Sequence, residues 1–109
     1  MERIYNKLVR DKIPDIIAAK NETPVTAILA ETEYKKALED KLYEEYQEVT
    51  EASGDERCED LADVIEVIRA LAKLENRSLE DIIKLADEKR AKRGGFDNRI
   101  FLEKVVEKA

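Results

Sequence analysis

Apolar side chains recur at helical spacing through the middle of the chain, which predicts a mainly α-helical fold. The first long helix is expected from Thr32 to Ser53, and Gly54 ends it. Asp55 can cap a second helix that continues to about Asn76. The connection between them is short, so we expect these two helices to form an antiparallel hairpin.

A third helix is expected from Leu79 to Arg93. Ser78 and Asp81 before it form a pattern similar to a capping box, and Gly94-Gly95 follows it as a stop signal. No internal repeat, linker or low-complexity tract interrupts the chain. The length therefore predicts one domain over residues 1–109.

The two ends of the chain carry weaker patterns. Met1–Lys12 is expected to be an extended arm, followed by a short helix from Pro14 to about Lys20. Residues 25–29 are rich enough in β-branched side chains for a short strand or an extended connector. Because the tail also alternates, a short strand pair between 25–29 and 99–105 is one prediction, and a short C-terminal helix is the alternative.

Carboxylates interrupt the apolar face of the first long helix. Glu45 lies in the middle of this face, Glu48 lies at its edge, and Lys41 lies beside them. The apolar positions of this face are Tyr34, Leu38, Leu42, Val49 and Ala52.

The second helix is apolar around nearly its whole circumference, yet Asp60 and Asp63 lie among its apolar positions. Such a helix in a small protein must be covered on two sides. We therefore expect a second subunit, in a homodimer or a homotetramer.

Four carboxylates drawn toward one core need a positive charge between them, because an unpaired buried carboxylate is very unfavourable. We expect this positive charge to be Mg²⁺, for which Mn²⁺ can substitute, since hard ions prefer oxygen ligands. The expected ligands are Glu45, Glu48, Asp60 and Asp63. The alternative is that these acids are surface charge on soluble helices, because 26 of the 109 residues are acidic.

Composition narrows the chemistry further. The chain has no histidine, which excludes catalytic triads, imidazole-bound zinc and histidine acid–base chemistry, and one cysteine, which allows no internal disulfide. A net charge of −6 argues against general nucleic-acid binding. Because no apolar stretch is long enough to cross a membrane, we expect a cytoplasmic protein without membrane partners.

The order of the charged blocks resembles the Glu-x-x-Glu and Glu-x-x-Asp signature of the MazG-like all-α nucleotide pyrophosphohydrolases, and is closest to the phosphoribosyl-ATP pyrophosphohydrolase-like branch. The blocks are Lys41-Leu42-x-Glu44-Glu45-x-x-Glu48 and Glu59-Asp60-Leu61-Ala62-Asp63, with Tyr5–Pro14 and Lys89-x-x-x-Arg93-Gly94-Gly95-Phe96 at the ends. The third ligand position differs from the family pattern, because Asp60 stands where the family has glutamate. Glu59 is the alternative ligand at that position.

This resemblance implies Mg²⁺-dependent hydrolysis of a nucleoside triphosphate between its α and β phosphates, which yields a monophosphate and pyrophosphate. Glu45 and Glu48 would be catalytic, and Glu45 is the first candidate for taking the proton of the attacking water, although the sequence does not choose. Basic side chains should complete a site for the phosphates. The candidates are Lys7, Arg10, Lys12, Lys41, Lys89 and Arg93.

Three functions remain open on the sequence alone. The first is removal of unwanted nucleoside triphosphates from the nucleotide pool. The second is the same chemistry on phosphoribosyl-ATP in histidine synthesis, because the basic arm suits a phosphoribosyl group equally well. The third is a non-catalytic helical oligomer that binds nucleotides or proteins.

Overall fold

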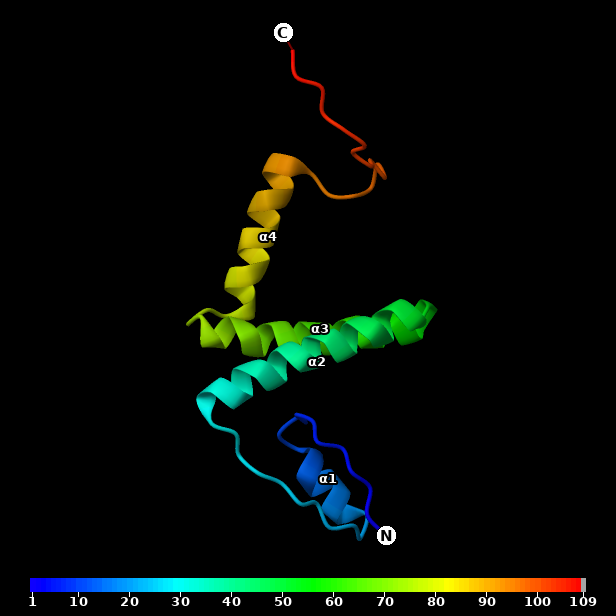
Figure 1. The fold of residues 1–109 in the computed structure, drawn as a ribbon, viewed down its shortest axis with the longest axis vertical. Coiled ribbons are helices and arrows are strands. Elements are labelled where there is room, and N and C mark those ends of the chain that lie inside the picture. The colour runs from blue at the N-terminus through cyan, green and yellow to red at the C-terminus, as the bar shows by residue number, and fades with distance from the viewer. Residues whose placement is uncertain (109) are drawn as a thin grey trace.

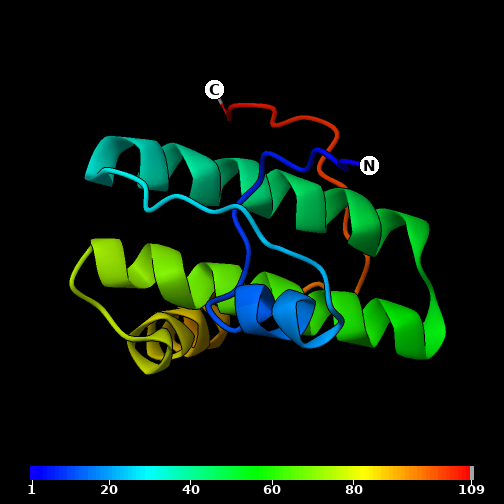
Figure 2. The same cartoon turned by 90° about the horizontal axis from the view of Figure 1, so that it is seen from below.

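Four helices make up most of residues 1–108, which are the residues that the computed structural model describes. They are α1 (Ile13–Ala19), α2 (Glu31–Glu51), α3 (Gly54–Leu74) and α4 (Leu79–Arg93). The long helices α2 and α3 lie side by side as an antiparallel hairpin, while α4 points away from it (Figure 1). Seen from below, α4 is viewed nearly end-on beside α3 (Figure 2). The mainly α fold and the hairpin are as predicted.

The residues that form the turn of the hairpin differ slightly from the prediction. Gly54 begins α3 instead of ending α2, and Ser53 holds the N-cap position that we expected for Asp55. Gly54 has a φ of +60°, a conformation that costs glycine little, so it can reverse the chain directly after Ala52. Arg57 Nε then donates to the Ala52 carbonyl at 2.8 Å, which satisfies a backbone oxygen at the end of α2.

Helix α4 begins and ends where the sequence predicts. The Asp81 N–H donates to Ser78 Oγ at 3.1 Å, and the Ser78 N–H donates to the Asp81 carboxylate at 2.9 Å. This pair is a complete capping box. At the other end, Gly94 has a φ of +82° and its N–H donates to the Arg90 carbonyl.

The short strand pair expected from residues 25–29 and 99–105 does not form. Both segments are extended chain, and the described residues contain no strand at all. The tail after α4 runs away from the rest of the molecule, so it offers no neighbouring backbone to 25–29 (Figure 1). The alternative of a short C-terminal helix is also wrong for residues 96–108.

The apolar core is small and lies between α2 and α3. Its buried apolar residues are Leu38, Ala52, Val67 and Ala72. The remaining apolar positions of the α2 face, Tyr34, Leu42 and Val49, are half-buried, which confirms the orientation predicted from their spacing. This core fixes how the carboxylates of the two helices face each other.

None of the helices in residues 1–108 is both long enough and apolar enough to span a lipid bilayer.

Candidate metal centre

Three of the four predicted ligands come together between α2 and α3. Glu45 and Glu48 from α2 and Asp63 from α3 each offer a carboxylate oxygen, and these oxygens lie within 4.8 Å of one another. The three-residue spacing on α2 places Glu45 and Glu48 on one side of that helix, and the hairpin brings Asp63 opposite them. This group, Glu45, Glu48 and Asp63, is called the carboxylate cluster below.

Glu45 is the buried member of the carboxylate cluster. Its residue surface is only 6% exposed, and its Oε2 has no hydrogen-bond partner in the described part of the chain. Burial, followed by the neighbouring Glu48 carboxyl, raises the pKa of Glu45 to about 7. Lys41 opposes this increase, because its Nζ lies 3.7 Å from Glu45 Oε1. An orphaned oxygen beside two other carboxylates is the arrangement that a bound cation would satisfy.

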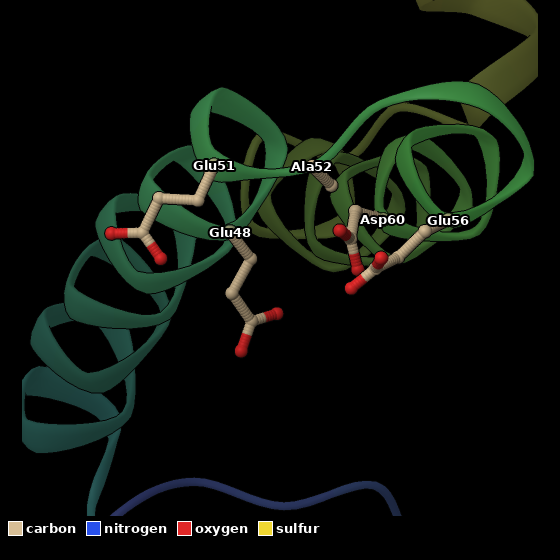
Figure 3. A pocket seen from close by; sticks show the side chains of 5 residues that line it. All are labelled: Glu48, Glu51, Ala52, Glu56 and Asp60. Carbon is tan, nitrogen blue, oxygen red and sulfur yellow. The ribbon is translucent and has the colours of Figure 1, made fainter.

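Asp60 lies outside the carboxylate cluster but near it. It lines a hollow of about 400 Å³ at the turn of the hairpin, together with Glu48. Figure 3 shows the carboxylates of Glu48, Glu56 and Asp60 pointing to the same side of the two helices. Glu59, the alternative third ligand, does not line this hollow and is exposed. Of the two candidates for the third position, Asp60 is therefore the one that faces Glu48.

Two acids of this hollow were missed by the sequence analysis. Glu51 and Glu56 line it beside Glu48 and Asp60, and we call the hollow the acidic pocket. A signal was present, because Glu51 follows Glu48 by three residues and Glu56 precedes Asp60 by four. Both spacings put the extra acid on the same helical side as a predicted ligand.

Three of the six predicted basic side chains form ion pairs with acids of the hairpin. Arg10 Nη2 lies 2.8 Å from Asp63 Oδ1, and Lys7 Nζ lies 3.3 Å from Glu44 Oε1. Lys41 Nζ lies 3.1 Å from Glu44 Oε2. Burial alone would raise the pKa of Glu44, but the hydrogen bonds and charges of Lys41 and Lys7 outweigh it, so the pKa falls. The N-terminal arm, residues 1–12, is thus held against the hairpin by two ion pairs.

The other three basic side chains are not brought to the carboxylate cluster within one chain. Lys12 is exposed and forms no ion pair with any residue of 1–108. Lys89 and Arg93 lie in the last turns of α4, which contacts α3 and then leaves the hairpin (Figure 1). Their sequence pattern predicts helix ends and basic blocks, but it carries no information on where the helix points.

Among known proteins, one curated relative matches part of this chain. No known protein-family model matches this chain, and neither does any solved structure. A curated protein of Mycolicibacterium smegmatis, described as uncharacterized, is 48% identical over 46 residues, which cover 42% of this chain and 47% of that relative. The chain therefore spans about half the length of the curated relative it matches.

Proposed function

We propose that this protein is a Mg²⁺-dependent nucleoside triphosphate pyrophosphohydrolase that acts in the cytoplasm on unwanted nucleotides. The observation that carries the proposal is Glu45, a buried carboxylate with an unpartnered oxygen that faces two further carboxylates across the hairpin. Its position agrees with the resemblance of the charged blocks to the MazG-like proteins. We therefore also propose that the chain is MazG-like.

The donor set fits a hard divalent cation. Glu45, Glu48 and Asp63 would hold the ion through oxygen atoms, and Asp60 lies close enough to Glu48 to share the acidic pocket. When bound, Mg²⁺ neutralises phosphate charge and makes water a better nucleophile. A site of few carboxylates is typical of Mg²⁺ centres that also bind substrate phosphates.

A side chain of the protein would supply the proton acceptor that the reaction needs. In the cleavage we propose, a water oxygen bonds to the α-phosphorus, the bond from that phosphorus to the α–β bridging oxygen breaks, and pyrophosphate leaves. One proton of the water must be accepted. Glu45 suits this role, because its Oε2 has no hydrogen-bond partner among the described residues and is therefore free to accept one.

The basic side chains near the cluster would orient the triphosphate. Lys7 and Arg10 stand on an extended arm whose guanidinium and ammonium groups already lie beside acids of the hairpin. Both pairs are partly exposed, so the two cations can exchange a carboxylate for a phosphate at little cost. Lys41 is more buried, and it would hold Glu44 and Glu45 in place instead.

The test is to remove one carboxylate from each helix of the hairpin. Glu48→Ala and Asp63→Ala should remain folded but lose Mg²⁺-dependent turnover at least about 100-fold, the upper end of what losing even an outer-shell metal partner costs. The matched control is Glu39→Ala, because Glu39 is an exposed glutamate of α2 outside the carboxylate cluster. Turnover that survives in both cluster variants, measured with circular dichroism as a check on folding, would reject the assigned site.

A further inference from the structure

Residues 1–22 fold back on themselves beside the hairpin, so that the N-terminal arm and α1 lie together (Figure 1). The arm runs directly into α1, because the Ile13 N–H donates to the Arg10 carbonyl at 3.0 Å. Arg3 Nη2 lies 2.6 Å from Glu22 Oε2, which ties the beginning of the arm to the chain that follows α1. We call residues 1–22 the N-terminal lid.

The N-terminal lid shares no apolar core with the hairpin. None of residues 1–30 is buried, and α1 packs against none of the helices α2, α3 and α4. Where the arm passes α2, a hollow of about 100 Å³ lies between residues 6–8 and the side of α2 that carries Lys41 and Glu44. Burial of apolar surface therefore contributes little to keeping the lid in place.

Two ion pairs attach the N-terminal lid to the hairpin. Arg10 Nη2 lies 2.8 Å from Asp63 Oδ1, and Lys7 Nζ lies 3.3 Å from Glu44 Oε1. Within residues 1–108, no other ion pair and no other side-chain hydrogen bond joins the lid to α2, α3 or α4. All four side chains are at least 33% exposed, so water competes for them and dissolved salt screens their charges.

The connector between the lid and α2, residues 23–30, is extended chain without helix or strand. Its Val25 and Ile28 side chains are 96% and 98% exposed, so they do not hold the connector against the hairpin. Extended chain of this length reaches up to about 26 Å. Changes in φ and ψ within the connector can therefore carry the lid away from the hairpin without altering either long helix.

We propose that residues 1–22 are a lid that swings on the connector, and that the Arg10–Asp63 and Lys7–Glu44 pairs are the latch that holds it across the hairpin. Arg10 reaches the carboxylate cluster directly through Asp63, whereas Glu48 is exposed toward the acidic pocket. The latched lid thus closes the Asp63 side of the cluster and leaves the Glu48 side open. Because the latch consists of exposed charges, ionic strength sets how often it opens.

The latch would also respond to substrate, a consequence that rests on the proposed function. Lys7 and Arg10, its two cations, are the groups that we assign to the triphosphate. A phosphate that takes both cations would release Asp63 and Glu44, so binding of substrate and opening of the latch would be one event. The closing experiments measure the position of the lid without metal or nucleotide, so their failure would leave the proposed hydrolysis standing.

The first experiment measures the distance between the lid and α3 by pulsed electron spin resonance. Cys58 is an exposed cysteine of α3, and Ala19→Cys adds a second labelling site at the exposed end of α1. Dilution with excess unlabelled chain makes distances within one chain dominate. With chelator and about 10 mM salt, we expect one narrow distance distribution, and at about 1 M salt a broad one, because the screening length falls from about 30 Å to about 3 Å.

Both alternative results would overturn the proposal. A distribution that stays narrow at 1 M salt would mean that contacts other than the two ion pairs fix the lid. A distribution that is already broad at 10 mM salt would mean that the ion pairs do not latch it. This comparison uses one labelled chain, so it does not depend on how a charge variant folds.

The second experiment removes the latch itself. At 10 mM salt, Lys7→Gln with Arg10→Gln should raise the ratio of open to latched lid by up to about 30-fold, since each exposed ion pair contributes up to about 5-fold. Lys12→Gln with Lys20→Gln is the matched control, because it removes the same charge from lid residues that form no ion pair within the described chain. Equal opening in both double variants, or none in the first while circular dichroism shows it folded, would reject the latch.

Discussion

Glu45 is the residue on which the proposed metal site depends most. A carboxylate that is 6% exposed, with one oxygen unbonded, disfavours the folded state whenever it is ionised. The neighbouring Glu48 increases this cost, because it adds like charge instead of compensation. A buried carboxylate of this kind is expected where a bound cation offsets the free-energy cost of burying its charge.

The raised pKa of Glu45 makes stability depend on pH in the absence of divalent cations. The carboxyl has an ordinary pKa of 4.5 in the unfolded chain and about 7 in the fold. The fold therefore retains a proton that the unfolded chain has lost, so stability falls as pH rises from 4.5 to 7. The free energy of unfolding should drop by about 3 kcal/mol across that window through this group alone.

Glu45→Gln should remove this dependence. At pH 8 with a chelator, urea unfolding should find the variant more stable than the unsubstituted chain, while near pH 5 the two should be similar. Glu44→Gln is the control, because the pKa of Glu44 is lowered and its substitution should not stabilise the fold at pH 8. Adding Mg²⁺ at pH 8 should stabilise the unsubstituted chain and leave Glu45→Gln nearly unchanged. A stability of the unsubstituted chain that rises from pH 5 to pH 8 without metal would contradict this description of Glu45.

At the scale of the elements, the N-terminal arm and the hairpin meet through charges that are far apart in the chain. Arg10 and Asp63 are 53 residues apart, and Lys7 and Glu44 are 37 apart. Arg10 occupies one oxygen of Asp63, so a cation bound at the carboxylate cluster would compete with its guanidinium for that carboxylate. The arm and the metal should therefore be coupled.

Arg10→Ala should strengthen Mg²⁺ binding, because Asp63 no longer has to release the guanidinium. The half-saturating Mg²⁺ concentration should fall by up to about 5-fold, which corresponds to the 1 kcal/mol upper limit for an exposed ion pair. Isothermal titration calorimetry measures this directly. Lys12→Ala is the matched control on the same arm, and it should leave the midpoint unchanged. Weaker Mg²⁺ binding in Arg10→Ala would mean that the arm supports the cluster instead of competing with it.

The helices and part of the site could be predicted from the sequence because their signals are local. The period of the apolar residues fixed which side of α2 carries Glu45, and Ser78 with Asp81 marked the start of α4. The direction of α4 and the return of Arg10 to Asp63 depend on contacts between distant segments, which no local pattern contains. The strand pair failed for a related reason, because alternation indicates a strand only where a second strand is available.

At the scale of the whole molecule, residues 1–108 combine a small core with an extended shape, whose radius of gyration is 19.1 Å. The fully buried apolar residues among 1–108 are few, so they alone offset only a small part of the chain entropy that folding costs.

The most direct test of the proposed hydrolysis is chromatographic product analysis of the purified protein with a panel of ribonucleoside and deoxyribonucleoside triphosphates and phosphoribosyl-ATP. The panel is run with Mg²⁺, with Mn²⁺ and with a chelator. We expect monophosphate and pyrophosphate with either metal and no turnover with chelator, and the preferred compound would separate nucleotide clearance from histidine synthesis. Release of orthophosphate would contradict the proposed cleavage between the α and β phosphates, whereas no turnover of any compound with either metal would favour a non-catalytic helical oligomer.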